Sequence, residues 1–150
     1  MRYLVTGATG FIGKRLVKTL LARKGSEVAF LVRDPAPERM AKLIDYWGVD
    51  ASRVKPLKGD LTKPDCGLSA ATIKGLGKID HMFHLAAIYD LAADPKEEME
   101  TNIEGTRNAV SLAGKVKAGC FHHVSSIAAA GLYNGVFRED MFDEAEHLEH

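Results

Sequence analysis

The sequence predicts a three-layer α/β protein, in which a parallel sheet of about five strands carries helices on both faces. Short apolar runs alternate along the chain with segments whose apolar residues recur every three or four positions, the spacing of one helix face. The run at residues 27–32 is almost continuously apolar, as expected of a strand that is buried on both faces. Strands joined by helical crossovers pair in parallel, so this order favours a doubly wound sheet.

The expected elements follow from these local patterns. The first helix should span residues 11–24 and end at Gly25, because glycine favours a helix end. Its apolar face comprises Phe11, Ile12, Leu16, Val17, Leu20 and Leu21. Strands are expected at residues 2–6, 27–32, 54–57, 79–87 and 120–124, and further helices at residues 38–46, within 64–77 and at 96–113. The last of these helices should stop near Gly114, and residues 131–135 should form a surface loop.

The composition indicates one globular domain over residues 1–150 and excludes several classes of function. Twenty basic and 20 acidic residues cancel, which argues against a nucleic-acid partner. No apolar run approaches the roughly 20 residues that a membrane span needs. The chain begins directly with a strand pattern, so no signal peptide is expected. Cys66 and Cys120 lie far apart and are expected to be reduced thiols of a cytoplasmic protein, with Cys120 buried in a strand.

Three glycines follow the first expected strand and open the first helix. Gly7 permits a sharp turn, Gly10 lets the backbone approach a pyrophosphate, and Gly13 lets the helix pack close to the strand. Phosphates would then meet the free N–H groups and the positive end of the helix dipole. A three-glycine pattern between a strand and a helix therefore predicts a dinucleotide-binding turn.

Several motifs then occur in a characteristic order. Thr6–Gly13 is followed by Gly59-Asp60-Leu61, by His84–Ala87, by Asn102–Thr106, and by Val124-Ser125-Ser126 with Gly131 five residues later. Together they resemble the extended short-chain dehydrogenase/reductase superfamily, which has a Rossmann-type domain that binds NAD(P). The Ser-Ser pair and the stretch 136–140 are most similar to the acyl-thioester and fatty-acyl reductase branch, the male-sterility type.

The resemblance implies a set of cofactor-binding residues. Asp60 should accept a hydrogen bond from the adenine amino group beside the Leu61 backbone, although a turn aspartate is the alternative. Ala86 and Ala87 are small where the ribose and nicotinamide approach. Asn102 should fix the backbone near the active site, unless it is an exposed helical asparagine. The full expected set is Gly7, Thr9, Gly10, Phe11, Ile12, Gly13, Arg33, Asp60, Leu61, Ala86, Ala87 and Asn102.

The end of the second strand bears on the choice between the two nicotinamide cofactors. An acid at this position binds the ribose hydroxyls of NAD, whereas a base accommodates the 2′-phosphate of NADP. Arg33 ends the strand and can grip a phosphate through two hydrogen bonds, and Lys14 could add charge nearby. NADP is therefore favoured. Asp34 follows directly and keeps NAD open as the alternative.

Ser126 matches the family position of the hydroxyl that hydrogen-bonds a substrate carbonyl, with Ser125 as the competing candidate. The family also uses a Tyr-x-x-x-Lys pair for proton transfer. None of the four tyrosines has a lysine four residues later, and the family position of this tyrosine would fall just beyond His150. We therefore expect a truncated nucleotide-binding domain that lacks the catalytic pair and the substrate-binding part.

The sequence thus predicts the nucleotide-binding portion of an NADP(H)-dependent oxidoreductase that reduces a carbonyl or acyl-thioester of a small-molecule substrate. The chain alone should be inactive. An NAD-retaining sugar-nucleotide epimerase or dehydratase and a non-catalytic redox sensor are the alternatives, and a homodimer is left open.

No metal site is predicted. His81 and His84 are three residues apart and His122 and His123 are adjacent, so within each pair the side chains of a strand would point to opposite faces. Structural roles are therefore expected for these histidines.

Overall fold

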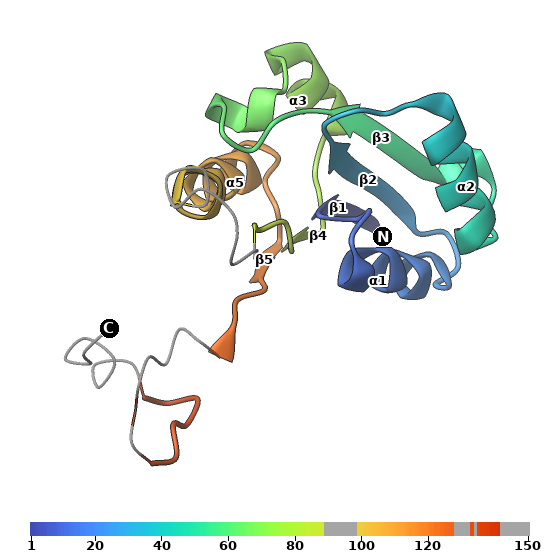
Figure 1. The fold of residues 1–150 in the computed structure, drawn as a ribbon. Helices are drawn as coiled ribbons and strands as arrows, with labels where there is room; N and C mark the ends of the chain where they lie inside the picture. Colours follow the sequence, from blue (N-terminus) through green and yellow to red (C-terminus); the bar gives the residue numbers. More distant parts are fainter. Residues whose placement is uncertain (89–98, 128–132, 134, 142–150) are drawn as a thin grey trace.

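A computed structural model describes residues 1–88, 99–127, 133 and 135–141 of the chain, and it confirms the predicted α/β class (Figure 1). Five parallel strands form one sheet in the order β3-β2-β1-β4-β5. The strands are β1 (Arg2–Thr6), β2 (Glu27–Val32), β3 (Val54–Lys58), β4 (His81–His84) and β5 (Cys120–His123). The α-helices are α1 (Phe11–Leu21), α2 (Pro37–Trp47), α3 (Ala70–Leu76) and α5 (Gly105–Lys115). Short 3-10 turns lie at Ala51–Arg53 and Pro64–Gly67, and a π-helical turn at Glu100–Glu104 precedes α5.

Two hydrophobic cores, one on each face of the sheet, hold the three layers together. Successive residues of a strand point to opposite faces, so Tyr3 and Val5 pack with α1 and α2 while Leu4 packs with α3 and α5. β2 divides in the same way, with Phe30 in the first core and Leu31 in the second. This two-sided burial explains why β2 reads as a continuous apolar run.

The topology reverses at β1. The chain moves from β1 to β2 and β3 on one side, and then crosses to β4 and β5 on the other (Figure 1). Leu4 pairs with Ala29 of β2 and with Met82 of β4, so β1 lies between the two halves of the sheet. In open α/β sheets the crevice at the carboxyl ends of the strands around such a reversal is where ligands bind.

Several element boundaries differ from the sequence prediction; among them, α1 ends at Leu21 rather than at residue 24. β4 ends at His84, because its neighbour β1 turns away at Gly7. The last main-chain hydrogen bond between them runs from the Leu85 N–H to the Thr6 carbonyl, at 3.3 Å. The predicted helix at residues 96–113 is described only from Met99, and it continues past Gly114 to Lys115. Gly114 has open space beside it, so nothing there forces the helix to stop.

Two burial predictions were wrong. Cys120 is exposed rather than buried, because β5 is the outermost strand of the described sheet. Phe11 and Ile12 are 73% and 59% exposed, because the first turn of α1 projects beyond the sheet. Only the later apolar residues of α1, such as Val17 and Leu21, reach the core. Among the described helices, none is long and apolar enough to span a membrane.

Candidate dinucleotide-binding site

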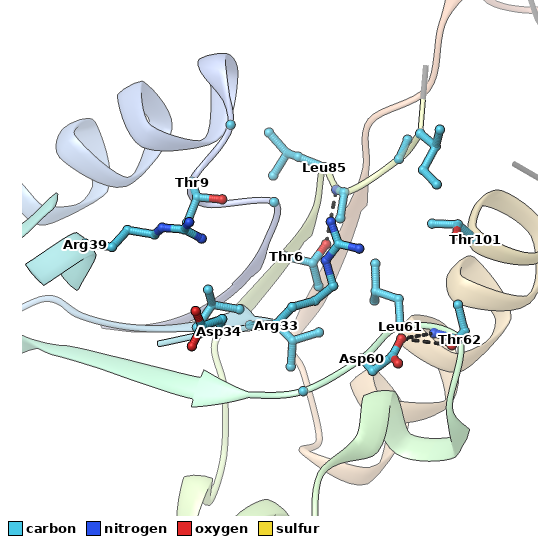
Figure 2. Close-up of a pocket in the computed structure, with 18 residues that line it drawn as sticks. Thr6, Thr9, Arg33, Asp34, Arg39, Asp60, Leu61, Thr62, Leu85 and Thr101 are labelled. Carbon is cyan, nitrogen blue, oxygen red and sulfur yellow. Dashed lines mark hydrogen bonds between the residues drawn. The ribbon is translucent and has the colours of Figure 1, made fainter. Parts of the chain in front are cut away.

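A cleft of about 770 Å³ opens at the carboxyl edge of the sheet, at the reversal around β1 (Figure 2). Four segments supply most of its lining: the turn between β1 and α1, the end of β2, the loop after β3, and the loop after β4. Arg39 of α2 and Thr101 of the π-helical turn complete it. Eight residues predicted from the sequence to bind cofactor meet here, namely Gly7, Thr9, Gly10, Arg33, Asp60, Leu61, Ala86 and Ala87.

The glycine turn is packed too tightly for side chains at two of its positions. Gly7 has a φ of +74°, which residues with a Cβ rarely adopt, and a Cβ there would lie 2.7 Å from the Ala86 nitrogen. A Cβ on Gly13 would lie 2.0 Å from the Gly7 carbonyl oxygen. The turn is therefore wedged between the start of α1 and the loop after β4, as the glycine spacing predicted.

The amino end of α1 has no side-chain cap. Gly10 is the N-cap residue, and the first turn contains no acidic residue. The Lys14 N–H donates to the Gly10 carbonyl at 3.0 Å, so the amides of residues 11–13 precede the first bond of the helix. Gly10 lines the cleft, whereas residues 11–13 do not. Any contribution of these three residues to cofactor binding is therefore through their main-chain amides. Unpaired amides and a positive dipole end make this helix mouth suited to a phosphate.

A buried histidine connects the glycine turn to α5. His84 is 1% exposed, and its Nδ1 lies 2.7 Å from the Thr6 hydroxyl while its Nε2 lies 3.1 Å from the Thr106 hydroxyl. Thr106 donates its proton to the Asn102 carbonyl, so its oxygen must accept a proton from Nε2. Thr6 accepts the Ala86 N–H, which leaves its own proton for Nδ1. With the Thr6 proton donated to Nδ1, the chain of hydrogen bonds suits a neutral imidazole protonated at Nε2.

The environment of His84 favours the same protonation state. Burial, with a smaller contribution from the charge of nearby His123, lowers the pKa of His84 to about 4. A neutral ring at physiological pH therefore holds Thr6, and with it the end of β1, in a fixed position against α5. The sequence showed a histidine here but gave no sign of its two threonine partners.

Two arginines and one aspartate line the cleft near the end of β2. Arg33 extends from the end of β2 into the cleft, and Arg39 reaches from α2 toward Thr9 (Figure 2). Among the ion pairs of the described residues, none involves Arg33, Arg39 or Asp34. Arg39 was not predicted from the sequence. After Arg33, it is the next basic residue along the chain and lies in the helix that follows β2, and this position could have identified it. Lys14 lies over the ring of Tyr46 and does not line the cleft.

Asp60 forms a local turn at the edge of the cleft. Its Oδ1 accepts the Thr62 N–H at 3.0 Å and the Thr62 hydroxyl at 2.8 Å (Figure 2). Those two hydrogen bonds lower the pKa of Asp60, and nearby Lys63 and Arg33 lower it slightly further. The structure therefore shows the turn role that was the alternative for Asp60, and adenine recognition stays a prediction.

Asn102 fixes the backbone of the loop after β4. Its amide group donates to the Ile88 carbonyl and accepts the Ile88 N–H, each at 2.8 Å. Ile88 lines the cleft next to Ala87, so the Asn102 side chain sets the position of the cleft wall that the loop after β4 forms. Asn102 is half-buried rather than exposed.

Ser126 lies three residues beyond β5 and is exposed. The Val124 N–H donates to the His84 carbonyl at 3.0 Å, which brings the strand end to the same edge of the sheet as the cleft. Neither Ser125 nor Ser126 lines the cleft itself. Gly131, whose spacing favoured Ser126, lies outside the described residues. The catalytic role of Ser126 stays a prediction.

The fold and this cleft define a nucleotide-binding α/β domain of the Rossmann type. The chain matches the family model described as male sterility protein over residues 5–149, and it therefore belongs to this NAD-binding family of the extended short-chain dehydrogenase/reductase superfamily.

Individual relatives agree with this family. A putative dihydroflavonol 4-reductase from Synechocystis is 34% identical over 140 residues, which cover 92% of this chain and 36% of that protein. A linear gramicidin synthase protein from Brevibacillus parabrevis is 32% identical over 133 residues, covering 83% of this chain and 3% of that protein. The chain thus spans only a small part of the curated relatives that it matches.

Solved structures share the fold. The terminal R domain of the myxalamid PKS-NRPS pathway superposes with a TM-score of 0.79 at 30% identity, covering 93% of this chain and 38% of that chain. A UDP-glucuronic acid 4-epimerase from Bacillus cereus in complex with NAD superposes with a TM-score of 0.71 at 25% identity, covering 98% of this chain and 50% of that chain.

Proposed function

We propose that the chain is the NADP(H)-binding portion of a reductase that acts on a carbonyl or acyl-thioester carbon. The observation that carries the proposal is the uncapped helix mouth at Gly10, which opens on the cleft at the reversal of the sheet. The main-chain amides after Gly10 would hold the diphosphate, and Ala86 and Ala87 would leave room for the ribose and nicotinamide. The bound cofactor supplies the hydride, while the chain supplies binding and orientation.

Charge around the ribose position supports NADP over NAD. Arg33 and Arg39 bring two guanidinium groups to the cleft wall, beside the carboxylates of Asp34 and Asp60. The Asp60 carboxylate is bonded to Thr62, whereas neither guanidinium is in an ion pair among the described residues. A 2′-phosphate carries about two negative charges and accepts bidentate hydrogen bonds from arginine. Two guanidinium groups that can both contact a phosphate favour the phosphorylated ribose.

The proposed reaction rests on two similar proteins and on Ser126. The linear gramicidin synthase protein and the R domain of a PKS-NRPS pathway resemble this chain, which favours a thioester-level substrate. Ser126 would donate a hydrogen bond to the substrate carbonyl oxygen and stabilise the charge that develops there. The proton donor of the Tyr-x-x-x-Lys type and the substrate-binding part would come from outside these 150 residues. The isolated chain should therefore bind cofactor without turning substrate over.

Calorimetric titration with NADPH and NADH tests the cofactor assignment. Arg33→Ala and Arg39→Ala should each weaken NADPH binding by about 10- to 100-fold, the equivalent of one or two charge-assisted hydrogen bonds, and leave NADH binding within about twofold. Arg107→Ala is the matched control, because Arg107 is exposed, pairs with Glu104 and does not line the cleft. Equal losses for both nucleotides, or no binding of either, would contradict the assignment.

An NAD-dependent epimerase is the second candidate, supported by the likeness to the 4-epimerase and by Asp34 at the end of β2. In that case the wild-type chain would bind NADH more tightly than NADPH. Asp34→Ala would then weaken NADH binding, whereas the reductase proposal expects it to leave NADPH binding unchanged or stronger.

A further inference from the structure

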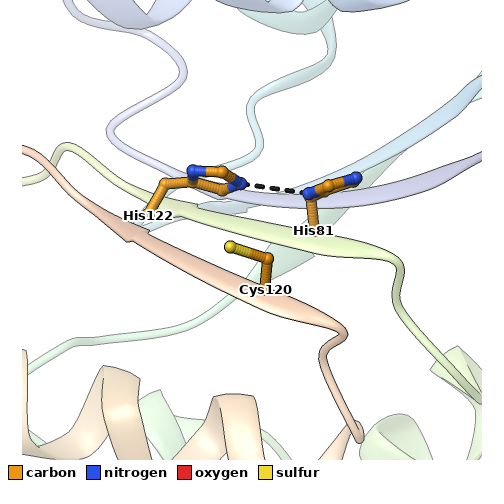
Figure 3. Close-up of side chains that lie close together, drawn as sticks. All are labelled: His81, Cys120 and His122. Carbon is orange, nitrogen blue, oxygen red and sulfur yellow. Dashed lines mark hydrogen bonds between the residues drawn. The ribbon is translucent and has the colours of Figure 1, made fainter.

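Three potential metal ligands meet on the sheet at a distance from the cofactor cleft. His81 starts β4, and Cys120 and His122 come from β5 (Figure 3). His81 Nδ1, Cys120 Sγ and His122 Nε2 all lie within 4.8 Å of one another. The register explains the cluster, because His81 pairs with Cys120 and Phe83 pairs with His122, so all three side chains share one face.

We propose that His81, Cys120 and His122 form a binding site for a borderline-soft divalent cation, Zn²⁺, that ties β5 to β4. Two imidazoles and one thiolate are ligands that zinc prefers, and a fourth position would be open to water. The two histidine nitrogens lie 3.0 Å apart, close to the roughly 3.3 Å that a tetrahedral zinc site sets between imidazole nitrogens. The thiol needs to move by only about 1 Å to complete the triad.

The two imidazoles are oriented before any cation binds. The ring of His122 stacks on Phe83 with centroids 4.3 Å apart and planes 9° apart. The ring of His81 stacks on Tyr3 at 5.9 Å. In the hydrogen bond between them one ring donates a proton to the other. Moving that proton to the outer nitrogen of its ring frees both facing lone pairs, and the thiol releases its proton to solvent.

The cluster is accessible and separate from the proposed cofactor site. Cys120 is exposed, and His81 and His122 are half-buried. His81 and Cys120 start their strands and His122 pairs with Phe83, whereas the lining of the cleft on the β4 side begins at Leu85, four residues along the chain from His81 and two from Phe83. At about 3.3 Å per strand residue, those separations are about 13 and 7 Å. The cation would therefore stabilise the outermost described strand and would not touch the reacting carbon.

The thiol of Cys120 can be distinguished from the other cysteine. Cys66 is buried, and burial raises the pKa of its thiol to about 12, so it stays protonated and unavailable to a cation. A thiolate-to-metal absorption band would therefore report Cys120. His147 and His150 lie outside the described residues. Both are replaced by alanine in every protein tested, including the reference protein called wild-type below, so that they do not bind metal themselves.

Titration of the chain with Co²⁺ under reducing conditions tests the proposal. One Co²⁺ per chain should produce a thiolate charge-transfer band and the intense visible bands of tetrahedral cobalt, and Zn²⁺ should displace it. Cys120→Ser should abolish the band. His122→Phe, which preserves the stack on Phe83, should weaken binding at least tenfold. His123→Ala is the matched control, because His123 is on the same strand and faces the other side of the sheet.

Thermal unfolding of the same proteins separates metal binding from folding. Zn²⁺ should raise the Tm of the wild-type chain and of His123→Ala by several degrees, and leave Cys120→Ser and His122→Phe unchanged. No band in the wild-type chain, a band that survives Cys120→Ser, or an equal loss in His123→Ala would overturn the proposal. Because both ligand variants are also compared without metal, a folding defect would be seen directly as a lower Tm.

Discussion

Each end of α1 leaves main-chain groups without a partner inside the helix, N–H donors at the amino end and C=O acceptors at the carboxyl end, yet side chains close only the carboxyl end. At the carboxyl end, Ser26 donates to the Leu20 and Arg23 carbonyls at 2.8 and 2.7 Å. Arg53 donates to the Leu21 and Arg23 carbonyls at 2.7 and 3.0 Å. At the amino end, Gly10 provides no side-chain cap and the first turn holds no acid.

This contrast shows where the protein leaves hydrogen-bonding capacity for a ligand. Uncapped helix ends cost stability, and proteins usually satisfy them with side chains. The carboxyl end of α1 lies away from the cleft and is satisfied within the chain. The amino end faces the cleft, so its amides are available to a phosphate. Four changes test this difference between the two ends of α1.

The largest effect is expected from Gly13→Ala. The new Cβ would lie 2.0 Å from the Gly7 carbonyl oxygen, so the open end of α1 would have to move away from β1. The free energy of unfolding should fall by about 3 kcal/mol or more, measured by chemical denaturation. Gly114→Ala in α5 is the matched control, because a Cβ there meets nothing within 4 Å. It should be neutral or stabilise by up to about 1 kcal/mol. A small effect of Gly13→Ala would refute the close packing of the turn.

The amino end of α1, the open end, should also become less stable at low pH. The pKa of His84 is lowered to about 4, below the ordinary value of 6.5, so the folded chain holds this residue neutral. The unfolded chain binds the proton more readily, and the stabilisation present above pH 6.5 is therefore lost as the pH falls toward 4. The loss should amount to about 3 kcal/mol from this group.

Urea denaturation at pH 7.5 and pH 4.5 measures this effect. His84→Gln removes the titrating ring and should reduce the fall in stability between the two pH values. His123→Gln, which changes an exposed histidine, should keep most of it. The same fall in both variants would show that His84 does not cause it.

Arg53→Ala should destabilise only the carboxyl end of α1, the closed end. It removes the bonds to the carbonyls at the end of α1, some of which water can replace because the site is only part-buried. The free energy of unfolding should fall by about 1–2 kcal/mol, while NADPH affinity should stay within about twofold. Arg107→Ala, at an exposed ion pair, should change stability by less than about 0.5 kcal/mol. A large loss of nucleotide affinity in Arg53→Ala would mean that the two ends are not independent.

The smallest effect on stability, and an opposite effect on binding, is expected from capping the open end. Gly10 has the extended backbone of an N-cap, so Gly10→Asp should change the free energy of unfolding by less than about 0.5 kcal/mol. Its carboxylate would occupy the phosphate position, and NADPH binding in calorimetry should weaken at least tenfold. Gly10→Ser caps without charge and should lose less. Unchanged affinity in both variants would place the phosphate elsewhere.

Much of the amino end of α1 could be predicted from the sequence. The spacing of Gly7, Gly10 and Gly13 predicted the turn, and the two-sided apolar run of β2 predicted a buried parallel strand. Such patterns are local, because glycine acts through its own backbone and periodicity through neighbouring residues. Burial was harder to predict: Cys120 was expected inside a sheet, but β5 is its outermost described strand.

The sequence by itself determined the elements, their order and the glycines that make the tight turn between β1 and α1 possible. The tertiary structure alone decided which distant side chains meet. It placed Arg39 beside the cleft, gave His84 its partners Thr6 and Thr106, and joined His81 to Cys120 and His122. The physical reason is register: His81 and His122 are 41 residues apart in the chain, and only the alignment of β4 with β5 puts both on one face. Periodicity within a strand carries no information about that alignment.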